Sequence, residues 1–291
     1  MSVHIPVMPT ETLEQLNLSP GSIVVDGTMG GGGHTMLLSQ QVGPTGRVIA
    51  LDRDPGTVGK AAAWLPTNAT AIHANYAALP IVLDELRIRQ VDSILLDVGL
   101  SSDQLADDAR GFSYRATGPL DLRFDETEGQ PAWHLLEHIR EKELADLIFE
   151  FGEERKSRVI ARRICETRRR TPIRTAEQLA DLIRSCVSRS KNHAIDPATR
   201  TFQALRIAVN EELKWLQRAL EQFPERLVPG GRFVVISFHS LEDRLVKNAF
   251  RSNPLLTVLT KKPLIAGNLE QHQNPRSRSA KLRSAEKTAT I

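Results

Sequence analysis

Short apolar runs alternate with helix-like stretches over the first third of the chain. Four runs are nearly continuous in hydrophobic residues and are typical of buried parallel strands, at 22–26, 47–52, 70–73 and 92–97. Apolar residues at helical spacing fill the stretches between them, at 34–41, 56–65 and 76–86. This alternation predicts a Rossmann-like α/β fold, in which a twisted and mostly parallel sheet carries helices on both faces.

The alternation stops after the fourth predicted strand. Residues 105–200 have no strand pattern, and their apolar residues instead predict helices at about 130–151, 153–169 and 175–188. Thr175 is the expected N-cap of the last of these helices. We therefore predict an all-helical insertion at 105–200 and expect this domain to recognise the substrate.

The strand pattern resumes beyond the insertion. An amphipathic stretch at 198–227 leads through a Pro-Gly-Gly turn signal into a buried apolar run at 232–237. The basic end of the chain, from Asn274 to Thr290, is expected to be partly disordered. The sheet domain should thus be formed by two separate parts of the chain, residues 1–104 and 201–291.

Composition places the chain among ordinary globular proteins, with 291 residues, 41% hydrophobic and 25% charged. The N-terminus lacks the basic and apolar segments of a signal peptide, and no apolar run approaches the ~20 residues of a membrane helix. Cys165 and Cys186 form no disulfide framework. These features lead us to expect a cytoplasmic protein with no membrane association.

Basic charge is concentrated in two segments, although the whole chain carries only +3. Residues 153–174 carry nine Lys or Arg against three Glu, and residues 251–291 carry eight against two, so each segment has a charge of +6. The rest of the chain then carries −9. Two such segments favour a polyanion-binding surface, whereas either one alone would fit a solvated helix face or a loose tail.

The strongest local motif is the turn after the first strand, which has five glycines within residues 27–33. Glycines at a strand-to-helix turn let the backbone approach a ligand closely, and the helix start beyond presents free N–H groups. The spacing lacks the third glycine of G-x-G-x-x-G, and no G-K-[ST] follows as in a nucleotide-binding P-loop. The turn therefore predicts a ligand cradle of a different type.

Three further side chains follow the next predicted strands. Asp52 is placed to accept hydrogen bonds from the two hydroxyls of a ribose, which indicates an adenosine-type ligand. Tyr76 either stacks on an adenine ring or starts a helix as a core residue. Asp97 ends the fourth strand beside this ligand, where it can hold the ligand, accept a proton or serve as an N-cap.

Several longer motifs resemble the bacterial ribosomal RNA small-subunit methyltransferase H family, and they are spread over nearly the whole chain. They are DGTMGGGGHT (26–35), LLDVGLSS (95–102), RGFSY (110–114) with GPLDLRF (118–124), TRTFQALRIAVNEEL (199–213), ISFHSLEDR (236–244) and NPRSRSAKLR (274–283). The resemblance implies a class I S-adenosylmethionine-dependent methyltransferase that methylates N4 of a cytidine in the decoding region of 16S rRNA. Its partner would be 16S rRNA within the small ribosomal subunit.

The same resemblance implies a set of contacts with S-adenosylmethionine, from Gly32, Gly33, His34, Asp52, Tyr76, Asp97 and Gln104. Two positions depart from expectation. Thr28 stands where the wider class has the first glycine of D-x-G-x-G, and Gly31 stands where the family often has a basic residue. The departure at Gly31 concerns the stiffness of the loop and not its contacts, and the departure at Thr28 means that a generic motif search would match this site only weakly.

Methyl transfer to an exocyclic amine needs an acceptor for the amine N–H, because the lone pair of that nitrogen is delocalised into the ring. Asp97 is the first candidate for this role, and His239, which follows the strand at 232–237, is the second. An isolated histidine there is more often structural. Contacts with the RNA backbone are expected from the basic end of the chain, at Arg276, Arg278, Lys281 and Arg283.

Other interpretations remain open. His134, Glu137 and His138 fit the H-x-x-E-H motif of a zinc peptidase, although the match is short and we expect no metal. An NAD-dependent oxidoreductase would use a similar sheet, and a non-catalytic RNA-binding protein could keep the cofactor fold. The sequence does not define the oligomeric state, and a homodimer is one of the possible states.

Overall fold

A computed structural model describes residues 5–187 and 196–289 of the chain. Within it the chain forms two compact units. One contains Met1–Gly99 and Leu213–Ile291 and is called the sheet unit; the other contains Leu100–Glu212 and is called the helical unit. The division falls at 100 and 212, whereas the sequence pattern indicated 105 and 200. The difference at the second boundary arises because α10 (Ala198–Asn210) packs against α7 (Glu141–Gly152).

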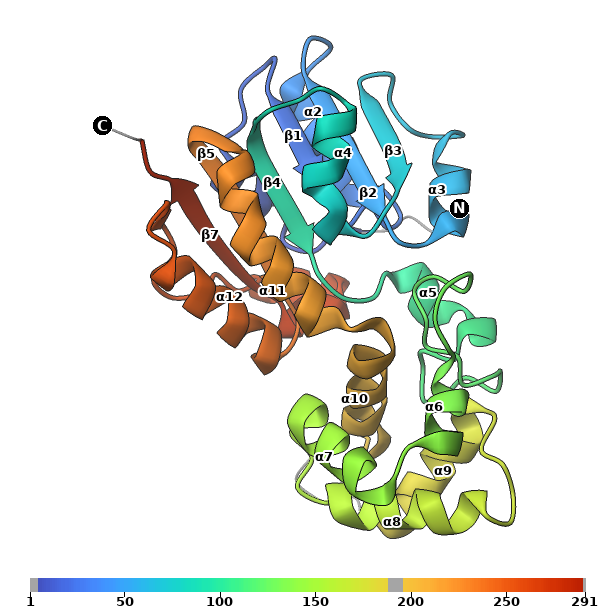
Figure 1. The fold of residues 1–291 in the computed structure, drawn as a ribbon. Helices are drawn as coiled ribbons and strands as arrows, with labels where there is room; N and C mark the ends of the chain where they lie inside the picture. Colours follow the sequence, from blue (N-terminus) through green and yellow to red (C-terminus); the bar gives the residue numbers. More distant parts are fainter. Residues whose placement is uncertain (1–4, 188–195, 290–291) are drawn as a thin grey trace. The chain divides into compact units, whose positions relative to one another are not determined.

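The described part of the sheet unit is built on one seven-stranded sheet in the order β3-β2-β1-β4-β5-β7-β6 (Figure 1). Strands β1 to β5 are parallel, and β7 runs antiparallel to both of its neighbours. This is the predicted mostly parallel α/β sheet, so the expected fold class is confirmed. The strands are Ile23–Asp26, Arg47–Asp52, Ala69–His73, Val91–Asp97, Leu227–Ser237, Leu256–Val258 and Lys281–Lys287, β1 to β7 in chain order.

Successive side chains of a strand point to opposite faces of the sheet. Because both faces carry apolar side chains, helices cover both of them. One apolar core includes Val25, Ile94 and Val235 with residues of α4, α11 and α12, and the other includes Val24, Leu95 and Val234 with residues of α1 and α2. The helices of the sheet unit are α1 (Pro9–Leu16), α2 (Gly33–Val42), α3 (Pro55–Ala61), α4 (Leu79–Glu85), α11 (Glu212–Gln222), α12 (Ser240–Ser252) and α13 (Asn268–Gln273).

The end of the chain differs from the prediction of partial disorder. The described residues after Asn274 form a 3₁₀ turn, η4 (Pro275–Ser279), and then β7, which pairs with β5 on one side and β6 on the other. For the described part of this segment, residues 274–289, the prediction was wrong, because β7 is paired on both sides and Asp243 is paired with two of its basic residues, Lys281 and Arg283; Thr290 lies outside the described residues. Arg283 is buried and its Nε atom donates to Asp243 over 2.6 Å.

The helical unit consists of α5 (Ser102–Ala106), α6 (Ala132–His138), α7, α8 (Ser157–Arg168), α9 (Ala176–Cys186) and α10. Its apolar core is drawn from residues 112–205. Thr175 is confirmed as the N-cap of α9, since its hydroxyl accepts the Gln178 N–H over 3.2 Å. The helix predicted at 130–151 is two helices, α6 and α7, and residue 188, the predicted end of α9, lies outside the described residues.

The amphipathic stretch at 198–227 is also interrupted. Glu211 adopts a left-handed conformation, with φ of 51°, and separates α10 from α11. No glycine or proline marks this break in the sequence. Across the described ranges 5–187 and 196–289, none of the helices has the length and apolar character needed to cross a membrane.

Candidate active site

The glycine-rich loop is held between two strands of the sheet unit. The Gly27 N–H donates to the Leu95 carbonyl of β4 over 2.9 Å, and the Met29 N–H donates to the Leu51 carbonyl of β2 over 2.8 Å. Gly32, the N-cap of α2, has φ of +82°, and a Cβ atom there would lie 2.2 Å from the ring of Trp64. Only glycine fits this position, because it tolerates both the left-handed backbone and the close aromatic neighbour.

The buried side chain of Asp26 forms hydrogen bonds with the glycine-rich loop and with α2. Asp26 Oδ2 accepts from the Thr35 hydroxyl over 2.7 Å, and Asp26 Oδ1 accepts from the Thr28 N–H over 3.1 Å. Burial raises the pKa of Asp26 above its ordinary value, and these hydrogen bonds oppose the shift. Asp26 therefore ties the loop to the first turn of α2.

Thr28, the departure from the D-x-G-x-G pattern, has a specific contact in the structure. Its hydroxyl oxygen accepts the backbone N–H of Asp97 over 2.7 Å. A glycine could not make this bond. The threonine thus joins the glycine-rich loop to the carboxyl end of β4, which is the strand end that carries Asp97.

Asp52 lies at the end of β2 and organises the same loop. Its Oδ2 atom accepts the Gly30 N–H over 2.7 Å, and its Oδ1 atom accepts the Asp54 N–H over 2.8 Å. Burial raises the pKa of Asp52 to about 6, although the two backbone hydrogen bonds act in the opposite direction. Each carboxylate oxygen can accept a second bond, so a ribose hydroxyl can be held without breaking the contact with the loop.

Asp97 is the last residue of β4, and its carboxyl group is largely buried. Its Oδ1 atom is buried and has no hydrogen-bond partner among the residues that the structure describes, and its Oδ2 atom lies 3.7 Å from Nε2 of the buried His34. Burial raises the pKa of Asp97 to about 7, a shift that Arg276 opposes and that Asp26 and Glu242 reinforce. A buried acceptor of this kind is costly unless a ligand completes it.

The predicted cofactor residues of the sheet unit meet at one edge of the sheet. Gly30 is bonded to Asp52 and Thr28 to Asp97. Tyr76 starts a 3₁₀ turn after β3, and a Cβ at Gly27 would lie 3.2 Å from its Cβ. His34, just after Gly33, lies in the first turn of α2. The carboxyl ends of parallel strands bring these groups together, as expected for a ligand site in an open α/β sheet.

Gln104 belongs to the helical unit, where it forms a capping box at the start of α5. The Gln104 N–H donates to the Ser101 hydroxyl over 3.1 Å, and the Gln104 side-chain oxygen accepts the Ser101 N–H over 3.1 Å. These bonds fix the start of the helix. The proposed contact between Gln104 and the cofactor stays a prediction.

His239 is the N-cap of α12. Its Nδ1 atom accepts the Glu242 N–H over 3.4 Å, and Glu242 Oε2 accepts the His239 N–H over 3.2 Å. The other ring nitrogen, Nε2, lies 3.0 Å from Glu242 Oε1. These contacts give His239 a structural role, and a catalytic one stays a prediction.

The four basic residues expected to bind RNA have different surroundings. Arg278 is exposed and its Nε atom donates to the Gln271 carbonyl over 3.1 Å. Lys281 and Arg283 both face Asp243, at 3.5 and 2.6 Å. The guanidinium of Arg276 lies 5.7 Å from the ring centroid of Phe238. Of these four residues, Arg278 is the most accessible to a partner, because within the described residues its side chain makes one hydrogen bond, to a backbone carbonyl. The other three have side-chain contacts with Asp243 or Phe238.

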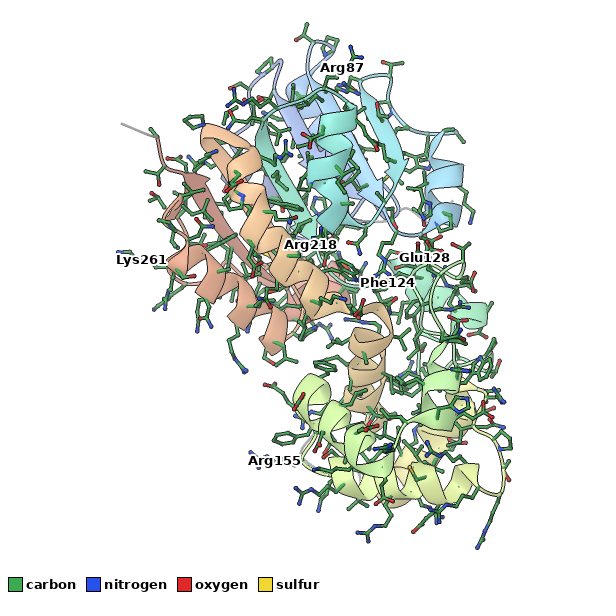
Figure 2. The ribbon with its side chains drawn as sticks, in the orientation of Figure 1. Arg87, Phe124, Glu128, Arg155, Arg218 and Lys261 are labelled. Carbon is green, nitrogen blue, oxygen red and sulfur yellow. The ribbon has the colours of Figure 1, made fainter. Side chains whose placement is uncertain are left out.

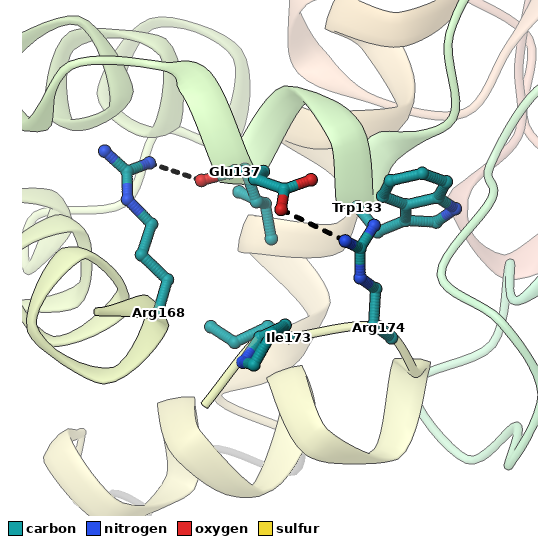
Figure 3. A pocket seen from close by; sticks show the side chains of 7 residues that line it. Trp133, Glu137, Arg168, Ile173 and Arg174 are labelled. Carbon is teal, nitrogen blue, oxygen red and sulfur yellow. Dashed lines mark hydrogen bonds and ion pairs between the residues drawn. The ribbon is translucent and has the colours of Figure 1, made fainter. Parts of the chain in front are cut away.

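The H-x-x-E-H motif lies on α6, with the rings of His134 and His138 4.5 Å apart. Glu137 is paired with Arg174 over 3.0 Å, and the Arg174 guanidinium lies 3.9 Å from the ring centroid of Trp133 (Figure 3). No group of three or more potential metal ligands occurs in the described ranges. The motif instead borders a pocket lined by Trp133, Leu136, Glu137, Arg168, Pro172, Ile173 and Arg174.

The chain is similar to known methyltransferases over its whole length. The model of the MraW methylase family matches residues 1–288. A protein of Rhodopirellula baltica named ribosomal RNA small subunit methyltransferase H is 48% identical, over 98% of this chain and 91% of that protein. Proteins of the same name from Trichlorobacter lovleyi and Deinococcus radiodurans are 44% and 46% identical, over 98% of this chain and 98% and 90% of theirs.

Proposed function

Because this chain belongs to the MraW methylase family, we propose that it transfers a methyl group from S-adenosylmethionine to the exocyclic N4 atom of a cytidine in 16S rRNA. The observation that carries this proposal is the buried Asp97 acceptor beside the glycine-rich loop. The names of the relatives support the RNA substrate. Family membership also sets aside the NAD-dependent oxidoreductase.

In this proposal the sheet unit holds the donor, and Asp97 prepares the acceptor. The loop of Gly32 and Gly33 would contact the methionine part of the cofactor, and Asp52 would accept the ribose hydroxyls. Methyl transfer neutralises the sulfonium, so the leaving group needs no acid and positioning supplies most of the acceleration. Asp97 Oδ1 would accept an amine N–H of the cytosine, which localises the nitrogen lone pair toward the methyl group.

We assign RNA recognition to the helical unit, as expected for the insertion. Residues 155–170, which comprise α8 and the residues that flank it, carry seven exposed basic side chains, here called the α8 basic surface. They are Arg155, Lys156, Arg158, Arg162, Arg163, Arg169 and Arg170, of which Arg155 is labelled in Figure 2. The ion pairs Arg162–Glu141 at 3.9 Å and Arg163–Glu166 at 3.8 Å are exposed and weak, so phosphates can compete for these arginines. The target base would be unstacked, most easily in loop RNA.

Substitution of the α8 basic surface should weaken RNA binding through the electrostatic part of the free energy. For Arg158→Gln and for Arg169→Gln, we expect a lower affinity and a salt slope smaller by roughly 0.7 to 0.9 per lost phosphate contact. Arg218→Gln, on the exposed face of α11 in the sheet unit (Figure 2), is the control. Filter binding at several salt concentrations measures the slope, and equal slopes in all variants would contradict the assignment.

Cofactor binding should depend on pH through Asp52. The folded protein holds the pKa of Asp52 at about 6, above its ordinary value, so the carboxyl becomes protonated as the pH falls through that value. A protonated carboxyl is the weaker acceptor for ribose hydroxyls, and affinity for S-adenosylhomocysteine should fall by up to about tenfold per pH unit below it. Calorimetry between about pH 5 and 8 tests this expectation. An affinity that is constant over this range would exclude an ionised Asp52 as the ribose acceptor.

Methylation in vitro tests the proposed function directly. Radiolabelled S-adenosylmethionine is supplied with naked 16S rRNA, with assembled small subunits and with DNA, and the modified nucleoside is identified after digestion. N4-methylcytidine from ribosomal RNA is the expected product. Binding of the RNA without any methylated product would instead favour the non-catalytic alternative. Assembled subunits as the preferred substrate would fit an enzyme that acts in the cytoplasm.

A further inference from the structure

We propose that His34 is a positioning residue for methyl transfer, whose imidazole holds one carboxyl oxygen of Asp97 so that the other oxygen faces the acceptor amine. The inference deepens the proposed function and rests on it for its effect on activity. It gives the side chain of His34 a role separate from the cofactor contact expected of this residue. Three observations support it: the distance between the two side chains, the way the fold holds Asp97, and the contact made by the next residue of α2.

The imidazole of His34 and the carboxyl group of Asp97 face each other in the interior of the sheet unit. His34 Nε2 is 3.7 Å from Asp97 Oδ2, and the two side chains are only 6% and 12% exposed. This distance is within the range of an ion pair but longer than a hydrogen bond. Catalytic contacts of this kind are often long in unliganded enzymes and shorten when the substrate binds. The two groups are therefore placed to form a direct hydrogen bond in the loaded enzyme.

Asp97 is held at its backbone and at one side-chain oxygen. Thr28 Oγ1 accepts its backbone N–H over 2.7 Å, and His34 faces its Oδ2 atom. The Oδ1 atom is buried and has no hydrogen-bond partner within residues 5–187 and 196–289. The terminal torsion of an aspartate is broad, so a partner at Oδ2 is needed to stop the carboxyl group from rotating. With Oδ2 held, Oδ1 is the atom that accepts an amine N–H.

The first turn of α2 has a second side chain that contacts a strand-end carboxyl group. Thr35 follows His34, and its hydroxyl donates to Asp26 Oδ2 over 2.7 Å. Consecutive residues of α2 thus contact the carboxyl groups that end β1 and β4, which are neighbouring parallel strands. The first N–H groups of a helix have no partner within the helix. The backbone of this turn can therefore contact the cofactor while its side chains position the carboxyl groups.

The experiment compares His34→Gln with His34→Asn, because the two amides place a nitrogen at different positions of the former ring. The glutamine amide can reach the position of Nε2, whereas the asparagine amide lies near that of Nδ1. We expect His34→Asn to lower kcat by about 10- to 100-fold, the cost of a misplaced catalytic group, and His34→Gln to recover part of this loss. The affinity for S-adenosylhomocysteine should stay within about twofold in both variants. His272→Asn, at an exposed histidine of α13, is the control and should keep the parent kcat.

A double-mutant cycle tests whether His34 acts through Asp97. In the Asp97→Asn background, His34→Asn should lower kcat by less than about twofold, because residues that act as a unit are not additive. A further loss of about tenfold in that background would overturn the proposal. So would a lower affinity for S-adenosylhomocysteine in both His34 variants with the parent kcat at saturating cofactor, since the imidazole would then be a cofactor contact.

A second measurement needs no RNA and no activity. The ¹³C carboxyl resonance of Asp97, assigned with Asp97→Asn, is recorded about two pH units above the pKa of about 7, where the carboxyl group is ionised. Both His34 variants lack the aromatic ring, so the resonance should lie closer to that of the parent in His34→Gln than in His34→Asn. The Asp52 resonance is the control. Equal displacements in the two variants would refute the inference, even if the proposed methylation itself is never observed.

Discussion

Asp97→Asn is expected to lower kcat by roughly 100- to 10⁴-fold, the range typical of a lost general base or proton acceptor. Asparagine keeps the shape of the side chain and the backbone N–H that Thr28 accepts. It removes the negative charge that would polarise the amine N–H of the cytosine. Single-turnover methylation with saturating cofactor measures the change, because it separates the chemical step from product release.

The stability of this variant provides its control. The folded-state pKa of Asp97, about 7, lies above its ordinary value of 3.8, so the ionisation of Asp97 destabilises the fold as the pH rises between these two values. Asp97→Asn should therefore melt at a temperature equal to or above that of the parent at alkaline pH. A well-folded Asp97→Asn protein that keeps more than about a tenth of the parent kcat would exclude Asp97 from the chemical step.

Gly32→Ala is expected to weaken the binding of S-adenosylhomocysteine at least about tenfold, which corresponds to 1.4 kcal/mol. The added Cβ would lie 2.2 Å from Trp64, in a residue whose φ is +82°. The left-handed backbone alone costs roughly 1 to 2 kcal/mol for a residue with a side chain. To relieve the contact, the loop or the indole must move, and the N–H groups at the start of α2 move with the loop. Calorimetry measures the affinity.

Gly43→Ala is the matched control at the other end of α2. Gly43 also has a positive φ, of +67°, but a Cβ there would meet nothing within 4 Å. With ψ of −175°, Gly43 adopts a conformation essentially reserved for glycine, so this variant should lose roughly 1 to 3 kcal/mol of stability to backbone strain while its affinity for the cofactor stays that of the parent. Equal losses of affinity in the two variants would mean that global destabilisation, and not the shape of the loop, controls binding.

Much of the fold follows from hydrophobic periodicity, because four of the five parallel strands, β1, β2, β4 and β5, are mostly buried and have sequences that are apolar runs. Strand β7 could not be found in this way, since Lys281–Lys287 contains only two aliphatic or alanine side chains for the core, Leu282 and Ala285. Its other buried positions are polar and depend on distant partners such as Asp243. The break at Glu211 was equally hidden, because a positive φ at glutamate has no sequence signal.

The site was predictable in part. The positions of Asp52 and Asp97 at strand ends indicated a ligand site, since parallel strands present their carboxyl ends at one edge. The sequence could not show that Asp52 also holds Gly30, or that Thr28 is bonded to Asp97, because such pairs form only when strands adopt their register.

The position of β7 has a consequence for synthesis of the protein. Until Lys281–Lys287 has left the ribosome, β5 lacks one neighbour and β6 lacks the strand it pairs with. The nascent chain therefore exposes unpaired backbone N–H and C=O groups along one side of β5. Such an unpaired strand edge promotes aggregation. Co-translational formation of the seven-stranded sheet would therefore finish only when β7 has been synthesised and has paired with β5 and β6.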